Sequence, residues 1–167
     1  DEQGSIDPQH GIGAMYHQGR GVAQDHKKAV EWYRKAAEQG NADAENNLGA
    51  MYLEGQGVPQ NNEEAVSWYA RAARHGSAEA QYNLARLYDQ GVIIPQDFKL
   101  AAELYRMAAN QGNTAAQNAL GMMYGKGLGV AQDDKGAVLW FLKAAERGNA
   151  EAQYNLGLMY ESGTGVP

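Results

Sequence analysis

The side chains best suited to metal binding or proton transfer are four histidines, because the chain contains no cysteine. They are His10, His17, His26 and His75. His10 and His17 fall on one face of an expected helix, but their spacing places them about 10.5 Å apart along its axis. Zinc on a helix needs ligands three or four residues apart. We therefore expect no metal site. His75 suits the negative end of a helix, and His26 is expected at the surface.

Other catalytic patterns are incomplete. The run from Gly121 to Lys126 partly matches a phosphate-binding loop, but it is one residue short and no Ser or Thr follows the lysine. A Gly-x-Ser-x-Gly nucleophile motif does not occur. Acidic residues recur mainly where helices are expected to begin and on expected exposed faces, which does not favour catalysis by paired carboxylates. The sequence therefore predicts no catalytic residues, no cofactor and no enzymatic activity.

Composition narrows the choice of partners. The 167 residues are 44% hydrophobic and 20% charged, which is typical of a globular protein. The net charge of −6 disfavours binding to nucleic acid. No apolar run approaches the roughly 20 residues that a membrane-spanning helix needs. We expect one domain that binds neither nucleic acid nor the membrane interior.

Residues of the same type recur every 36 positions, without insertion or deletion. These columns include Gly40, Gly76, Gly112 and Gly148; Tyr16, Tyr52, Tyr88, Tyr124 and Tyr160; and Trp32, Trp68 and Trp140, with Leu104 in the remaining repeat. A fixed period of this length indicates stacked structural repeats, each of which buries its apolar faces against its neighbours.

Each repeat is expected to contain two short helices, a first helix A and a second helix B. In the second repeat, the apolar periodicity predicts helix A over 42–54 and helix B over 62–74. Asn61 has the side chain of an N-cap, and Gly76 is expected to end helix B in a left-handed conformation. The other repeats carry Asp25, Asp97 and Asp133 at the position of Asn61.

Small residues on helix A predict a close approach by helix B. Gly49 recurs as Gly13, Gly121 and Gly157, with Ala85 in the third repeat. Because the loops are short, the two helices of a pair are expected to be antiparallel. Repetition with a constant rotation then predicts an all-α, right-handed superhelix whose concave side is lined by helix A.

The repeat has the pattern Ala-x-Ala-x-x-x-Leu-Gly-x-Met-Tyr-x-x-Gly-x-Gly-Val-x-Gln-Asp, followed by Ala-x-x-Trp-Tyr-x-x-Ala-Ala-x-x-Gly. It resembles the Sel1-like repeat family, a branch of the tetratricopeptide superfamily. The resemblance implies an α-solenoid of bacterial type that acts as a protein-binding scaffold or adaptor. It also favours a periplasmic or secreted location, with a cytoplasmic one open.

The expected repeats are 5–40, 41–76, 77–112, 113–148 and 149–167, the last containing helix A alone. The first residues look like the tail of a preceding helix B, so we expect part of a longer array. Pro8, Gly11 and Gly13 predict a frayed or irregular helix A in the first repeat. The third repeat lacks the tryptophan.

Superposition on the tetratricopeptide pattern, through the shared Leu-Gly-x-x-Tyr, places five positions of each helix A in the groove. Over these 25 positions seven residues are acidic and two are basic, so we expect a protein or peptide partner with a neutral or basic segment. Tyr82 and Tyr154 are candidate anchors because they lie outside the periodic columns. The predicted binding residues are Asp43, Asn46, Leu53, Glu54, Glu79, Tyr82, Arg86, Asp89, Asn118, Met122, Lys126, Glu151, Tyr154 and Leu158.

Two alternatives stay open. The array can be a structural spacer of a larger protein, with a groove that binds nothing. Some proteins with this type of repeat have been linked to β-lactam binding or hydrolysis, but no acyl nucleophile stands out in this sequence.

Overall fold

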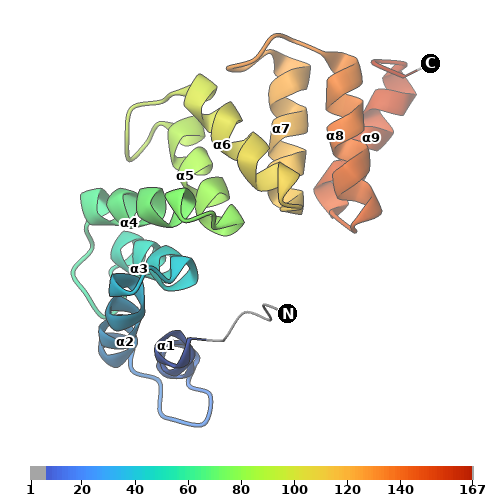
Figure 1. Cartoon of the computed structure of the whole chain (residues 1–167). Coiled ribbons are helices and arrows are strands. Elements are labelled where there is room, and N and C mark those ends of the chain that lie inside the picture. Colours follow the sequence, from blue (N-terminus) through green and yellow to red (C-terminus); the bar gives the residue numbers. More distant parts are fainter. Residues whose placement is uncertain (1–6, 167) are drawn as a thin grey trace. The chain divides into compact units, whose positions relative to one another are not determined.

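The computed structural model describes residues 7–166, and all the regular structure within that range is helical. The nine helices of this range are shown in Figure 1. In chain order they are α1 (Pro8–Gln18), α2 (His26–Glu38), α3 (Ala42–Glu54), α4 (Asn62–Arg74), α5 (Ala78–Gln90), α6 (Phe98–Asn110), α7 (Thr114–Lys126), α8 (Asp134–Glu146) and α9 (Ala150–Ser162). Odd-numbered helices are the A helices of the repeats, and even-numbered helices are the B helices.

The chain folds as two compact units, with the boundary inside α5. The N-terminal unit ends at Ala80, and the C-terminal unit begins at Gln81. In the N-terminal unit α1 packs on α2 and α3 packs on α4, while α2 also packs on α3. In the C-terminal unit α7 and α8 form such a pair, and α6 and α9 pack on its two members. This architecture confirms the all-α class with paired helices. The handedness of the superhelix stays a prediction.

The predicted helix ends are confirmed in the second repeat, where α3 and α4 have the predicted bounds. Asn61 caps α4, because its Oδ1 accepts the backbone N–H of Glu64 at 3.1 Å. Asp25, Asp97 and Asp133 cap the equivalent helices in the same way. The backbone N–H of Lys28 holds the pKa of Asp25 below its usual range. Gly76 ends the helix with φ of +90°, a conformation that disfavours a side chain.

Helix A and helix B approach closely at a glycine, as predicted, and the group that approaches is an aromatic ring. A Cβ at Gly49 would lie 2.7 Å from Cδ1 of Tyr69. Gly13 and Gly121 face Tyr33 and Phe141 in the same manner. At Gly157 an added Cβ would meet no atom within 4 Å. In the first, second and fourth repeats, the ring buried on this glycine joins the two helices into one core.

The expectation of a frayed or irregular helix A in the first repeat is wrong. Helix α1 is a regular helix of 11 residues rather than a frayed one. Asp7 caps it by accepting the N–H of Gln9, and Pro8 occupies the first turn, where a missing N–H costs nothing. Trp68 is half-buried and packs against the core. The predicted tail of a preceding helix lies outside the described residues.

Between residues 7 and 166 no helix has the length and apolar character that crossing a membrane requires. The same part of the chain holds no cluster of three or more side chains suited to binding a metal ion.

Candidate functional site

The predicted binding residues lie on four A helices, α3, α5, α7 and α9 (Figure 1), and most of their side chains are accessible to solvent. Eight are exposed: Asp43, Glu54, Glu79, Arg86, Lys126, Glu151, Tyr154 and Leu158. Leu53, Tyr82, Asp89 and Met122 are half-buried. Each compact unit therefore carries part of the predicted face.

Two members of the predicted set, Asn46 and Asn118, are buried, at 7% and 3% exposure. The Oδ1 of Asn118 accepts a hydrogen bond of 3.0 Å from Nδ2 of Asn155, on the next A helix. Asn47 and His10, on α3 and α1, make a similar side-chain contact at 3.1 Å. These amides join successive A helices beneath the face. Asn46 and Asn118 are therefore largely shielded from solvent, and their contact with a partner stays a prediction.

Three predicted residues, Met122, Lys126 and Leu158, line one cavity of about 260 Å³ in the C-terminal unit. We call it the α7–α9 hollow. Its other lining residues are Gly121, Gly125, Phe141, Asn155 and Met159. The lining combines aliphatic, thioether and aromatic groups with one amide and one ammonium group. Such a mixture suits an apolar side chain of a ligand and a polar neighbour that fixes its orientation.

Two side chains that line the hollow, Gly125 and Phe141, are smaller than their equivalents in the first three repeats. In the third repeat, the hydroxyl of Tyr105 donates to Oδ2 of Asp89 at 3.4 Å. The fourth repeat has Phe141 and Gly125 at these positions, so both the hydroxyl and its partner are missing. In the first repeat, Nδ1 of His17 lies 3.3 Å from the hydroxyl of Tyr33. The space that a polar pair fills in those repeats is open in the fourth.

Burial raises the pKa of the tyrosines of these pairs. It raises the pKa of Tyr33 to about 12. Burial and the carboxylate of Asp89 also raise the pKa of Tyr105. Both hydroxyls are therefore protonated at neutral pH, and neither can act as a base.

The two candidate anchor tyrosines differ in their surroundings. The ring of Tyr82 is half-buried against Tyr105, with the ring centroids 5.8 Å apart. The side chain of Tyr154 is 67% exposed, and that of Leu158, one turn later on α9, is 44% exposed. Tyr82 thus packs against Tyr105, whereas Tyr154 and Leu158 present apolar area to solvent on α9.

The model of the Sel1 repeat family matches the chain five times in succession, at residues 9–41, 42–77, 78–113, 114–149 and 150–167. The chain belongs to the Sel1 repeat family. Each matched segment contains one A helix and, in all but the last, one B helix.

Solved structures of bacterial Sel1 repeat proteins are similar to this chain. A protective antigen of uropathogenic Escherichia coli with an SLR fold is 40% identical, with a TM-score of 0.92 over 99% of this chain and 36% of the antigen. A Sel1 repeat protein from Oxalobacter formigenes is 39% identical, with a TM-score of 0.88 over 95% of this chain and 65% of that protein. An immunity protein from Pseudomonas aeruginosa is 27% identical, with a TM-score of 0.62 over 94% of this chain and 60% of the other.

The chain thus spans about a third and about two thirds of the first two relatives. A search of curated proteins gave no significant match.

The Sel1 repeats also contain a buried ionic cluster that the sequence reasoning missed. Glu45 on α3 is fully buried; its Oε1 lies 2.6 Å from Nε of Arg71, and its Oε2 lies 2.8 Å from Nδ1 of His75. Arg71 also donates from Nη2 to the carbonyl oxygen of Ala37 at 2.8 Å. The equivalent residues of the next three repeats are glutamines, so a single Glu in a Gln column is the sequence feature that marks the cluster. Because Glu45 has no access to solvent, its role is structural.

The histidines of the first Sel1 repeat take part in packing. His17 lies between the Tyr33 hydroxyl and Oε1 of Gln56, each at 3.3 Å. His26, expected at the surface, is half-buried, and its ring packs edge-on against that of His17 with centroids 5.5 Å apart. His10 and His17 both contact the ring of Tyr33. The three histidines of this repeat, which were considered as metal ligands, therefore make contacts with other side chains of the fold.

Proposed function

We propose that this Sel1 repeat array is a non-catalytic scaffold that binds a protein or peptide on the face formed by its A helices. The observation that carries the proposal is the α7–α9 hollow, which is lined by three of the predicted binding residues. An apolar side chain of the partner occupies the hollow in this proposal, against Met122, Leu158 and Phe141.

The charges of the proposed face differ between the two compact units. In the N-terminal unit the face carries Asp43, Glu54 and Glu79 and no basic residue, giving −3. In the C-terminal unit the predicted residues include two acids and two bases, which cancel. Charge complementarity sets orientation and association rate more than affinity. A basic segment of a partner therefore suits the face of the N-terminal unit, and an apolar anchor suits the hollow of the C-terminal unit.

The hollow can be filled with groups that the protein already uses. Gly125→Asp with Phe141→Tyr recreates the Tyr105–Asp89 pair of the third repeat. A Cβ at Gly125 would lie 3.7 Å from Cβ of Ala137, an ordinary contact, and its φ is not positive. The filled variant is thus expected to melt close to the wild type while it lacks the hollow.

The test is affinity capture from a lysate of the source organism, or of its host, with the wild type and the filled variant as baits. A second bait, Tyr82→Ala with Tyr154→Ala, removes the anchor tyrosines. A matched control, Glu103→Ala, changes an exposed residue of the B helix α6. The proposal predicts a protein captured by the wild type and the control and lost with the other two baits. Capture that survives both changes would contradict it.

Charge reversal separates the scaffold from a structural spacer. Replacing Asp43, Glu79 and Glu151 by lysine is expected to weaken capture strongly, because a basic segment then meets like charges, which is unfavourable. If a function-dependent phenotype tolerates all three reversals, the spacer interpretation replaces the proposal.

A further inference from the structure

In each of the first three repeats, a side-chain hydrogen bond links the end of helix B to the first turns of helix A. In the first repeat Nε2 of Gln39 donates to Oε1 of Gln9 at 2.8 Å. In the third, Nε2 of Gln111 donates to Oε1 of Gln81, also at 2.8 Å. In the second repeat, Nδ1 of His75 lies 2.8 Å from Oε2 of Glu45. These two residues are the equivalents of Gln39 and Gln9. A donor from the end of helix B thus reaches the same side chain of helix A in three successive repeats.

The fourth repeat breaks this pattern. The residue at the end of helix B is Arg147, and its Nη1 donates to the carbonyl oxygen of Gly112 at 2.8 Å instead. The residue on helix A is Gln117, whose Nε2 donates to the carbonyl oxygen of Ala109 at 3.0 Å. Within the described part of the chain, Oε1 of Gln117 has no hydrogen-bond partner, although the residue is only 5% exposed. A buried acceptor without a donor is costly and indicates a missing group.

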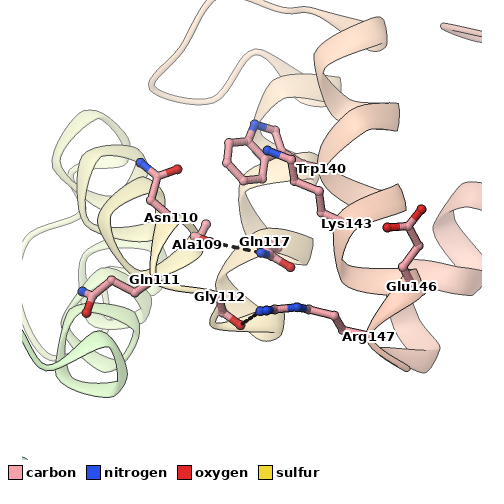
Figure 2. A pocket seen from close by; sticks show the side chains of 9 residues that line it. All are labelled: Ala109, Asn110, Gln111, Gly112, Gln117, Trp140, Lys143, Glu146 and Arg147. Carbon is pink, nitrogen blue, oxygen red and sulfur yellow. Dashed lines mark hydrogen bonds between the residues drawn. The ribbon is translucent and has the colours of Figure 1, made fainter. Parts of the chain in front are cut away.

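Gln117 lines a cavity of about 350 Å³, which we call the α8 cavity (Figure 2). Helix α8 contributes Trp140, Lys143 and Glu146, with Arg147 directly after it, and the rest of the lining comes from the end of α6 and the turn that follows it. The ammonium group of Lys143 lies 4.2 Å from the centroid of the Trp140 ring. The cavity lies wholly in the C-terminal unit and shares no residue with the predicted binding face.

The chemistry of the lining defines its ligand. A neutral N–H group suits the buried Oε1 of Gln117, because a charged donor would lose its hydration there. Lys143 and Arg147 with Glu146 give the lining a net charge of +1, which suits one carboxylate. The indole of Trp140 offers an apolar surface to a side chain.

We infer that the α8 cavity binds an acylated amino acid unit, in which an amide N–H stands next to a free carboxylate. Gln117 accepts the N–H, Arg147 and Lys143 hold the carboxylate, and Trp140 packs on the side chain. A small N-acyl amino acid and the last residue of a peptide chain share this chemistry.

The test is a titration of the ¹⁵N-labelled full chain, followed by the NMR signals of the Trp140 indole and the Gln117 amide. The probes are N-acetyl-leucine, the tripeptide acetyl-Ala-Ala-Leu and its C-terminal amide. We expect both free acids to shift the two signals, and the amide to bind at least about tenfold more weakly, since it lacks the charge-assisted bonds. If the tripeptide binds about tenfold more tightly than N-acetyl-leucine, the ligand is a peptide end, and equal affinities indicate the small molecule.

Two variants and a control complete the test. Arg147→Gln introduces the residue of the third repeat, so the new amide is expected to donate to Gln117, close the cavity and abolish binding. Lys143→Met, which copies Met107 of the third repeat, is expected to weaken binding about tenfold. Arg74→Gln removes one exposed charge from α4 and should bind like the wild type. Equal binding of the acid and the amide, normal binding by Arg147→Gln, or no shift at millimolar probe would each overturn the inference.

Discussion

Replacement of Glu45 tests whether the buried ionic cluster stabilises the second repeat. Both carboxylate oxygens are engaged, one 2.6 Å from Arg71 and one 2.8 Å from His75. Removing one partner of a buried ion pair typically costs about 3–5 kcal/mol. The side chains of Arg71 and His75 are 37% and 43% exposed, so they can regain water when the carboxylate is lost. For Glu45→Ala we therefore expect the lower end of that range, a loss of about 3 kcal/mol.

Glu45→Gln separates charge from shape. A glutamine fills the same volume and can still accept from His75, as Gln81 accepts from Gln111. It loses the charge-assisted part of two contacts, so we expect a loss of about 1–2 kcal/mol. Gln153→Ala changes the equivalent residue of the fifth repeat, which is exposed and makes one bond of 3.1 Å to Ala145. It should cost under about 1 kcal/mol.

The assay for these three variants is urea denaturation at pH 7, with the midpoint and the m value compared with those of the wild type. We expect Gln153→Ala to be the most stable of the three variants, Glu45→Gln to be less stable, and Glu45→Ala to be the least stable. An unchanged midpoint for Glu45→Ala, or a larger loss for the glutamine than for the alanine, would refute the reasoning.

The remaining predictions concern packing, turns and caps, and each is checked by the shift in a urea or thermal midpoint. Tyr52→Ala should cost about 3–5 kcal/mol because the ring is 8% exposed, whereas Tyr160→Ala should cost much less because its ring is 57% exposed; equal losses would contradict this. Gly76→Val should lose about 1–2 kcal/mol through backbone strain alone, since φ is +90° and no atom lies within 4 Å of the added Cβ. Asp133→Ala should lose about 1 kcal/mol with the cap of α8, and no loss would show that the cap contributes nothing.

The fold follows from local features that are visible in one repeat and copied in the others. The bounds of α3 and α4 were predictable because N-cap residues, apolar periodicity and a terminal glycine all agree. The prediction of a frayed first helix was wrong because it rested on the low helix propensity of Pro8 and the glycines. In the structure Pro8 stands in the first turn and Gly13 receives the ring of Tyr33, so both residues fit their positions.

The candidate sites were harder to predict, because they depend on departures from the repeat and not on the repeat itself. The α7–α9 hollow needs both Gly125 and Phe141, which lie on different helices, and neither is unusual alone. Oε1 of Gln117 has no partner because the side chain of Arg147 donates to Gly112 instead. No sequence pattern specifies the direction of the Arg147 side chain. Burial of Asn118 depends on the next A helix. Pairs of equivalent positions that change together from one repeat to another, such as Gly125 with Phe141, indicate these sites. Comparing the repeats pair by pair identifies such positions in the sequence.

The most direct test of the binding face is site-specific photo-crosslinking in the cells that produce the protein. A benzoylphenylalanine is placed at Leu158, beside the α7–α9 hollow, and in a second variant at Glu103, an exposed residue of the B helix α6. The account predicts a discrete protein adduct from position 158, none from position 103, and loss of the adduct when Gly125→Asp and Phe141→Tyr fill the hollow. An adduct from position 103 alone, or one from position 158 that survives filling, would contradict the claim that a partner is anchored in the hollow.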